Sequence, residues 1–230
     1  MATSCARDDD RDFDSSELGT KEYWDSAYEK ECENFEDVGD VGEIWFGEET
    51  MVKVANWIED CDDIKLDDDI IDLGSGNGMM CIELRKRGYN KLTGVDYSDL
   101  AVTLSKSVAK SEGYEDIQFE TGDLITNVQP NPCSCLNKQY KLVLDKGTYD
   151  AISLMPDDSI SPRKQYLQTV KDVMTEGSLY SITSCNWTKD QLIDFFKEDF
   201  VLHSQIPFRT FQFGGQTGST VTSLLFKLKS

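Results

Sequence analysis

Residues 70–78 read Ile-Ile-Asp-Leu-Gly-Ser-Gly-Asn-Gly, and this stretch decides the fold. A short apolar strand runs into the three alternate glycines Gly74, Gly76 and Gly78, and a helical pattern begins directly after them. Glycine permits positive φ and lets a ligand approach the backbone, while the first turn of a helix offers free N–H groups. We therefore expect a strand, a tight turn and a helix that together bind a nucleoside-bearing ligand.

Asp72 lies two residues before the first glycine and indicates which ligand the turn binds. The spacing is G-x-G-x-G, whereas the dinucleotide fingerprint is G-x-G-x-x-G. The carboxylate of Asp72 would repel a pyrophosphate, but it would attract the ammonium group of a methionine moiety carried beside a sulfonium. The sequence therefore favours S-adenosylmethionine over NAD as the cofactor.

Two further carboxylates stand at the ends of the next two predicted strands. Asp96, followed by Tyr97, comes 18 positions after Gly78, close to the roughly 20 expected for an acidic group that holds ribose hydroxyls. Asp123 ends the third strand, where its carboxylate can accept a hydrogen bond from the adenine amino group while Leu124 packs on the ring. A single strand-end aspartate often caps a helix or forms a turn, but three in register at one sheet edge predict a ligand site.

Strand and helix patterns alternate over the rest of the chain, which is typical of an α/β fold with a doubly wound, mainly parallel sheet and helices on both faces. The last two of seven expected strands should pair antiparallel, because residues 207–219 are glycine-rich and too short for a crossover helix. The predicted strands are 69–73, 91–96, 117–121, 140–145, 179–184, 200–206 and 221–228, and the predicted helices are 78–87, 100–112, 163–174 and 189–197.

The N-terminal part divides into a tail and a folded preamble. Residues 1–16 are acidic and nearly free of large apolar side chains, so we expect a disordered tail. Residues 17–66 should form a helical preamble to a single domain that spans residues 17–230, because apolar residues recur at helical spacing between positions 51 and 58. Residues 126–139, which include two prolines, are expected to form a surface loop.

The charge of the chain limits the classes of partner. Its 43 acidic and 23 basic residues give a net charge of −20. Such a charge repels phosphate groups, so nucleic acids and anionic membranes are disfavoured, whereas a basic protein surface would be attracted. The alternative is that the negative charge only keeps the protein soluble, because many aspartates occur in short local runs and such runs are usually solvated.

The cysteines and the single histidine predict neither a disulfide framework nor a metal site. Seven irregularly spaced cysteines and no apolar signal region predict a reducing compartment, and we expect a soluble monomer in the cytoplasm, with the nucleus as a second location. Cys133 and Cys135 have no histidine or second cysteine pair near them in sequence, so metal binding is not expected. His203 lies in a late predicted strand and is expected to be structural.

Taken together, the turn with Asp72, the Gly-Val-Asp96-Tyr motif and the Gly-Asp123 motif resemble the seven-strand S-adenosylmethionine-dependent methyltransferases. More narrowly, four stretches resemble the family of protein-lysine methyltransferases that modify eukaryotic elongation factor 1-alpha. They are Tyr-Trp at 23–24, Val-Gly-Asp-Val-Gly-Glu-Ile-Trp-Phe-Gly at 38–47, Asp-Lys-Gly-Thr-Tyr-Asp at 145–150 and Asn-Trp-Thr at 186–188. The resemblance implies the strand order 3-2-1-4-5-7-6, a lysine ε-amine as acceptor and elongation factor 1-alpha as the partner.

Several residues are candidates for handling the acceptor amine. Asp145, at the end of the fourth strand, could orient the amine or receive its proton through water, or it could instead pair with Lys146 or cap the next helix. Tyr149 and Trp187 could wall a lysine channel or pack in the core. The resemblance implies that Trp45 and Phe46 fold over the cofactor site, where an aromatic ring can hold a methylated ammonium by cation–π attraction, although core packing is an equal alternative.

Three alternative functions stay open at this point. An NAD-linked oxidoreductase would share Asp96 but should show the longer glycine spacing without Asp72. A methyltransferase-like adaptor would bind cofactor or partner without transferring a methyl group. A methyltransferase acting on another protein or on a small molecule would use the same sheet.

Overall fold

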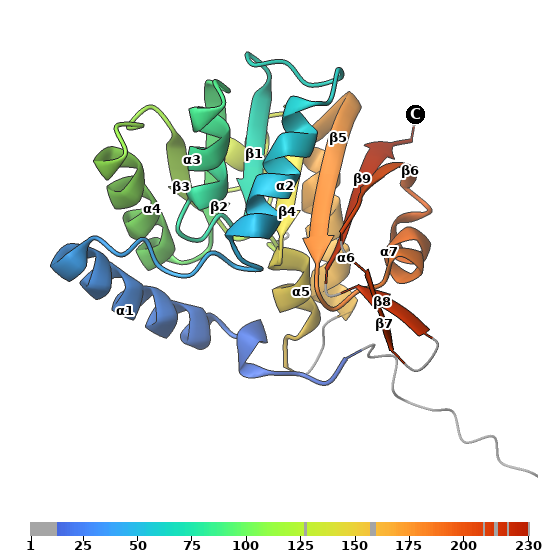
Figure 1. The fold of residues 1–230 in the computed structure, drawn as a ribbon, viewed down its shortest axis with the longest axis horizontal. Coiled ribbons are helices and arrows are strands. Elements are labelled where there is room, and N and C mark those ends of the chain that lie inside the picture. Colours follow the sequence, from blue (N-terminus) through green and yellow to red (C-terminus); the bar gives the residue numbers. More distant parts are fainter. Residues whose placement is uncertain are drawn as a thin grey trace, which may run out of the picture.

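The computed structural model describes residues 13–126, 128–156, 160–208, 210–213, 216–219 and 221–229. Its main sheet has the strand order β3-β2-β1-β4-β5-β9-β6 (Figure 1). Strands β1 to β5 run parallel, and β9 runs antiparallel to both β5 and β6. This confirms the predicted strand order and the antiparallel last strand. The strands are β1 (Asp69–Leu73), β2 (Lys91–Asp96), β3 (Gln118–Thr121), β4 (Tyr140–Lys146), β5 (Met174–Ser184), β6 (Phe200–Ile206) and β9 (Thr222–Leu228).

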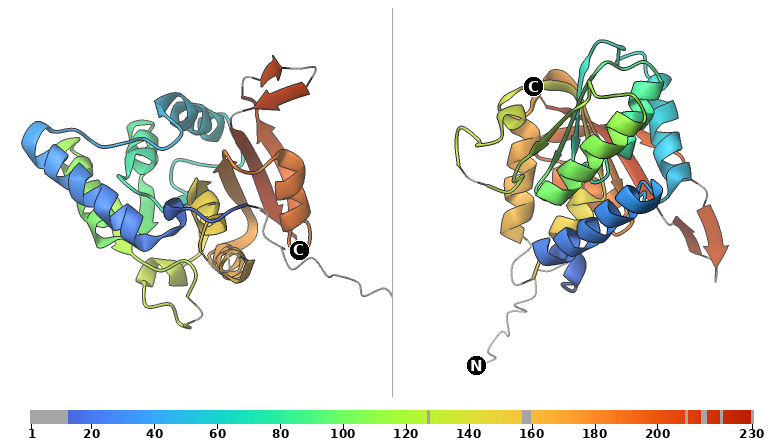
Figure 2. Two further views of the ribbon diagram at one scale, coloured as in Figure 1. Left: turned by 90° about the horizontal axis from the view of Figure 1, so that it is seen from below. Right: turned by 90° about the vertical axis from the view of Figure 1, so that its left-hand side faces the viewer.

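Helices cover both faces of the sheet, as predicted (Figures 1 and 2). Successive strand residues point to opposite faces, so Ile70 joins a core beneath α2, α3 and α4, while Ile71 joins a second core beneath α5, α6 and α7. None of the helices in the described ranges is both long and apolar enough to span a bilayer. The helices are α1 (Lys21–Val38), α2 (Glu48–Glu59), α3 (Met79–Lys86), α4 (Asp99–Ser111), α5 (Thr148–Ser153), α6 (Ile160–Asp172) and α7 (Lys189–Phe196), with short 3-10 turns η1 (Glu17–Gly19) and η2 (Ser134–Asn137).

The N-terminal helix α1 lies along the edge where the parallel strands end (Figure 1). It begins after Thr20, whose side chain accepts a hydrogen bond from the backbone of Tyr23, and it ends at Gly39, which has φ 75°. Residues 1–12 of the expected disordered tail lie outside the described residues. The ordered chain begins before residue 17, because Phe13 packs edge-on against Trp187 with ring centroids 4.7 Å apart.

The structure corrects the predicted elements in three places. Helix α5 was missed because it has only six residues and follows Gly147 directly, which is too short for a periodic pattern. A hairpin of β7 (Thr210–Phe213) and β8 (Gln216–Ser219) forms within the segment that was expected only to connect the last two strands. The predicted surface loop 126–139 contains η2 and buries Cys135 and Leu136, because the side chains of Asn131 and Asn137 satisfy its backbone groups.

We predict that Gly78→Ala destabilises the protein more than a matched glycine substitution. Both Gly78 (φ +75°) and Gly113 (φ +81°) have left-handed backbones, but a Cβ at Gly78 would lie 2.8 Å from Phe119 and Ser105, whereas one at Gly113 would meet nothing within 4 Å. Gly113→Ala should therefore cost about 1–2 kcal/mol of unfolding free energy. Gly78→Ala should cost about 1–3 kcal/mol more, from overpacking. Urea denaturation followed by circular dichroism measures both, and equal losses would contradict the close packing at Gly78.

Candidate functional site

A cavity of about 730 Å³ opens at the carboxyl ends of the parallel strands. This volume suits a ligand the size of a nucleoside with an attached amino acid. Its wall comes from the N-terminal segment, the glycine turn, the ends of β2, β3 and β4, the loop after β3 and helix α5. The lining residues are Leu18, Gly19, Lys21, Trp24, Tyr28, Glu43, Trp45, Gly74, Ser75, Gly76, Asn77, Asp96, Tyr97, Thr121, Gly122, Asp123, Leu124, Ile125, Thr126, Asn131, Pro132, Cys133, Lys146, Gly147, Thr148, Ala151, Ile152 and Met155.

The glycine turn forms one wall of the cavity and is held by the end of β2. The backbone N–H groups of Gly74 and Ser75 donate to the Val95 carbonyl at 2.7 and 3.0 Å. Gly74 and Gly76 line the cavity with φ of 73° and 54°. Both therefore lie where the predicted cofactor would contact them.

Gly78 is not among the residues that line the cavity, so its expected contact with the cofactor stays a prediction. It caps the start of α3 with φ 75°, and its α-carbon faces Phe119 and Ser105. Its role is to let α3 approach its neighbours closely.

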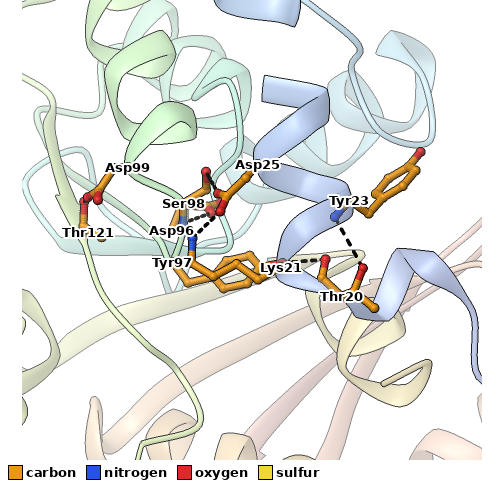
Figure 3. Close-up of polar contacts among 9 residues, drawn as sticks. All are labelled: Thr20, Lys21, Tyr23, Asp25, Asp96, Tyr97, Ser98, Asp99 and Thr121. Atoms are coloured by element: carbon orange, nitrogen blue, oxygen red, sulfur yellow. Dashed lines mark hydrogen bonds and ion pairs between the residues drawn. The ribbon is translucent and has the colours of Figure 1, made fainter. Parts of the chain in front are cut away.

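Asp96 and Tyr97 line the cavity at the end of β2, as predicted (Figure 3). The Asp96 carboxylate accepts hydrogen bonds from the backbone N–H groups of Gly76 and Ser98, both at 3.0 Å. Burial raises the pKa of Asp96 to about 6, although these hydrogen bonds oppose the shift. The hydroxyl of Tyr97 donates to the Thr20 carbonyl, which ties this edge to the start of α1.

Asp72 lies behind the glycine turn and not in the cavity wall itself. Only 3% of its surface is exposed, and burial raises its pKa to about 6, against the opposing positive charge of Lys146. Its carboxylate can therefore act on a ligand as a nearby negative charge, and the expected contact with the cofactor stays a prediction.

Asp123 and Leu124 both line the far end of the cavity, where an adenine was expected. Asp123 is exposed, and its carboxylate accepts from the backbone N–H of Ile125 at 2.9 Å. Leu124 is buried and offers an apolar surface beside it. The cavity thus combines a carboxylate and an apolar side chain at this end.

Three aromatic residues from the N-terminal part of the chain form the wall opposite the sheet. Trp45 lines the cavity as expected, and it packs edge-on against Trp24 with ring centroids 5.3 Å apart. Trp24 stacks on Tyr28, and both also line the cavity. Trp24 and Tyr28 are four residues apart, and this spacing indicated a helix. It did not indicate that the helix reaches the cavity. Phe46 packs on Trp45 with an unusual φ of 65° and is not among the lining residues.

Asp145 is not among the residues that line the cavity, so its expected role in orienting the amine stays a prediction. Its side chain is 2% exposed and accepts from the backbone N–H groups of Thr148 and Tyr149 and from the hydroxyls of Tyr166 and Tyr180. Burial raises its pKa to about 7. The alternative of a helix cap fits these contacts, because the carboxylate holds the start of α5.

Tyr149 and Trp187 are core residues in this structure and do not line the cavity. The Tyr149 ring packs against Trp187, Phe195 and other rings of the second core. The Trp187 Nε1–H donates to Ser153 Oγ at 3.1 Å. These contacts fit the alternative of core packing, and the lysine channel between the two residues stays a prediction.

Neither the cysteine pair nor the single histidine was predicted to belong to the site. Cys133 and Cys135 have their sulfur atoms 3.1 Å apart, and Glu120 lies beside them because the loop folds back onto β3. No sequence pattern indicated that Glu120 lies beside the two cysteines. His203 lies on β6 with Nε2 4.0 Å from Asp63, and it is not among the cavity-lining residues.

The residues present fit a nucleoside with a positive charge. Carboxylates of Asp96 and Asp123 and the buried Asp72 surround the cavity with negative charge, and aromatic rings supply an apolar wall. A pyrophosphate would be repelled by the same carboxylates.

Known proteins give an independent comparison. Residues 64–222 match the model of a methyltransferase domain family. The chain is 46% identical to EEF1A lysine methyltransferase 2 of Danio rerio over 94% of this chain and 90% of that protein. It is 41% identical to EEF1A lysine methyltransferase 2 of Homo sapiens over 94% and 88%. Its fold matches a TehB-like SAM-dependent methyltransferase of Corynebacterium glutamicum with a TM-score of 0.59 and 16% identity, over 89% of this chain and 98% of that one.

We predict that Asp145 makes stability depend on pH. The folded protein holds the Asp145 proton with a pKa of about 7, whereas an aspartate in the unfolded chain titrates near about 3.9. Between these values the Asp145 contribution to the unfolding free energy falls as the pH rises. The Asp145→Asn variant should therefore lose about 1–3 kcal/mol less stability than the wild type between pH 5 and pH 7.5.

Urea denaturation of both proteins at the two pH values measures this difference. The raised pKa values of Asp72 and Asp96 act with the same sign, but both groups are present in both proteins and cancel. Repeating the measurement at high salt separates the general repulsion that comes from the net charge of −20. Parallel pH dependence in the two proteins would contradict the prediction.

Proposed function

This chain belongs to the methyltransferase domain family and, within it, to the EEF1A lysine methyltransferase 2 family, and we propose that it methylates a lysine of elongation factor 1-alpha. It is an S-adenosylmethionine-dependent protein-lysine N-methyltransferase. The proposed substrate rests on the 46% sequence identity with EEF1A lysine methyltransferase 2 of Danio rerio. The alignment covers nearly the full length of both chains, so it includes the N-terminal segment that walls the cavity.

S-adenosylmethionine supplies an activated methyl group on a sulfonium, so the protein has to hold and align the reactants. The Asp96 carboxylate would hold the ribose hydroxyls of the bound cofactor, and the hydrogen bonds that it accepts from the backbone of Gly76 and Ser98 fix it in place. Asp123 and Leu124 offer a hydrogen-bond acceptor and an apolar surface for the adenine. These positions lie on strand ends of a rigid sheet, which favours a defined orientation of the reacting bond.

The acceptor lysine must lose its proton before it can attack, although a free lysine has a pKa of about 10.4. The aromatic wall of Trp24, Tyr28 and Trp45 supports this step, because apolar surroundings disfavour the charged form of the amine. A positive charge on the bound cofactor acts in the same direction. Asp145 is sealed beneath α5, so we propose that the proton leaves to water and not to a side chain of the core.

The surface charge supports a basic protein as the substrate. Glu43 lines the cavity, and the net charge of −20 would attract a basic surface and speed its encounter. The same charge supports our proposals that nucleic acid and anionic membranes are not partners. We further propose that the enzyme acts as a monomer in the cytoplasm; the six cysteines of the described residues are free, which suits the reducing conditions there.

The substrate proposal predicts a labelling pattern. Purified elongation factor 1-alpha and an extract of cells lacking this enzyme are each incubated with the protein and labelled S-adenosylmethionine. Label should enter one protein, and mass spectrometry of peptides should locate it on a lysine. Label in RNA, in small metabolites or in another protein, with elongation factor 1-alpha unlabelled, would exclude the proposed substrate.

The aromatic wall predicts a specific loss of transfer. Trp45→Ala should lower kcat/KM by about tenfold or more, because it opens the cavity to water and removes a ring beside the amine. Trp45→Phe should recover part of that loss. Trp57→Ala, on the half-buried face of α2 outside the cavity, should lower stability but leave kcat/KM unchanged. An equal loss in both alanine variants would show that the effect is structural.

A further inference from the structure

Few of the described residues that line the cavity are positively charged, and the cofactor contacts proposed for Asp96, Asp123 and Leu124 do not use them. Among the described residues that line the cavity, two carry a positive charge, Lys21 and Lys146. Lys21 pairs with Asp25 at 2.7 Å and lies over the Tyr97 ring, at the ribose end (Figure 3). Lys146 lines the cavity at the end of β4, and its Nζ donates to the Trp45 carbonyl.

The fold directs Lys146 to the same side of the sheet as Asp72. Residues alternate along β4, so Leu142, Leu144 and Lys146 share a face, and β1 pairs with β4 such that Asp72 is opposite Leu144. The attraction between Asp72 and Lys146 opposes the burial that lowers the pKa of Lys146. No carboxylate oxygen of the described residues comes within 4.0 Å of Lys146 Nζ. Lys146 and Asp72 are therefore close charges that do not form a direct ion pair.

The ammonium group of Lys146 has hydrogen-bonding capacity left over. Nζ donates to the Trp45 carbonyl at 3.1 Å, which uses one of its three N–H donors. Its side chain is half-buried and lines the cavity. A partly buried ammonium that lines a cavity and has two N–H donors free of protein acceptors is suited to bind an anionic group of a ligand.

The methionine end of the cofactor carries an ammonium and a carboxylate. The ammonium suits the negative field of Asp72, but the carboxylate would be repelled by Asp96, Asp123 and Glu43. We propose that Lys146 binds the carboxylate of the cofactor and makes the cavity select ligands that carry it. This assignment rests on the use of S-adenosylmethionine by the proposed enzyme. Asp72 would then attract the ammonium of the methionine moiety, and Lys146 would bind its carboxylate.

The same contact couples the cofactor to the aromatic wall. Lys146 holds the Trp45 carbonyl, and the Trp45 indole lies against Gly147 and Trp24. A carboxylate on Lys146 satisfies the ammonium that anchors this wall. Cofactor binding should therefore order the Trp45 segment, and a ligand without the carboxylate should order it less.

The test compares two sulfonium ligands by calorimetric titration. Decarboxylated S-adenosylmethionine keeps the sulfonium and the amine but lacks the carboxylate, so the ratio of the two dissociation constants isolates that group. The wild type should prefer S-adenosylmethionine by about 10- to 100-fold, as expected for a hydrogen-bonded charge pair. Lys146→Met should bind S-adenosylmethionine more weakly by a similar factor and decarboxylated S-adenosylmethionine unchanged or tighter. Lys146→Arg should keep part of the preference.

Lys21→Met is the matched control, because Lys21 also lines the cavity but lies at the ribose end, and it should leave the ratio unchanged. Equal weakening of both ligands by Lys146→Met would overturn the proposal and leave Lys146 as a support for Trp45. Unchanged binding with a slower transfer rate would also overturn it and place Lys146 beside the acceptor amine. The titration needs no acceptor protein, so a wrong protein substrate would not alter its result. Failure of the wild type to bind either ligand would instead refute the cofactor.

Discussion

The site depends on one set of hydrogen bonds, which folds the turn after β1 back onto the end of β2. Gly76 donates its backbone N–H to the Asp96 carboxylate, while Gly74 and Ser75 donate to the Val95 carbonyl. The turn can make these bonds because glycine adopts the left-handed conformation without the cost that a Cβ would add. The bond from Gly76, together with one from the backbone N–H of Ser98, offsets the cost of burying the Asp96 carboxylate at the cavity wall. Sheet order, turn and carboxylate therefore form one unit.

The second wall comes from a distant part of the chain and is held by the same turn. The side-chain amide of Asn77 donates to the carbonyls of Val41 and Glu43, so the segment before Trp45 is tied to the glycine turn. Ser98 donates to Asp25 of α1, directly after the strand that ends in Asp96 (Figure 3). The residues that position the cofactor pocket thus also position the aromatic wall, which explains why α1 and the block at 38–47 belong to the same site.

The sequence was a good guide where one local pattern determines the outcome. Alternating strand and helix patterns predicted the parallel α/β sheet, the short glycine-rich connection predicted its antiparallel last strand, and the family resemblance implied the strand order. The positions of Gly76 and Asp96 at the ends of two predicted strands also indicated that both lie at the cavity. It was a poor guide where contacts join distant segments. Trp24 is helical by its spacing, but its contact with Trp45 depends on the path of the chain between α1 and α2. Helix α5 escaped notice because six residues are too few to show a period.

The neighbouring residues Asp145 and Lys146 illustrate a signal that the sequence did contain. Strand residues alternate between faces, and Leu144 lies in the core on the same side as Ile70, while Val143 lies on the opposite side. Asp145 must then follow Val143 into the second core, where tyrosine hydroxyls and the start of α5 satisfy it, and Lys146 must point toward the face of Asp72. The charge that can meet a ligand is consequently the cation, because a carboxylate one position earlier is directed into the opposite layer. The alternation of side chains along β4 therefore decides which of the two residues faces the cavity. That an aspartate is a common catalytic residue does not decide it.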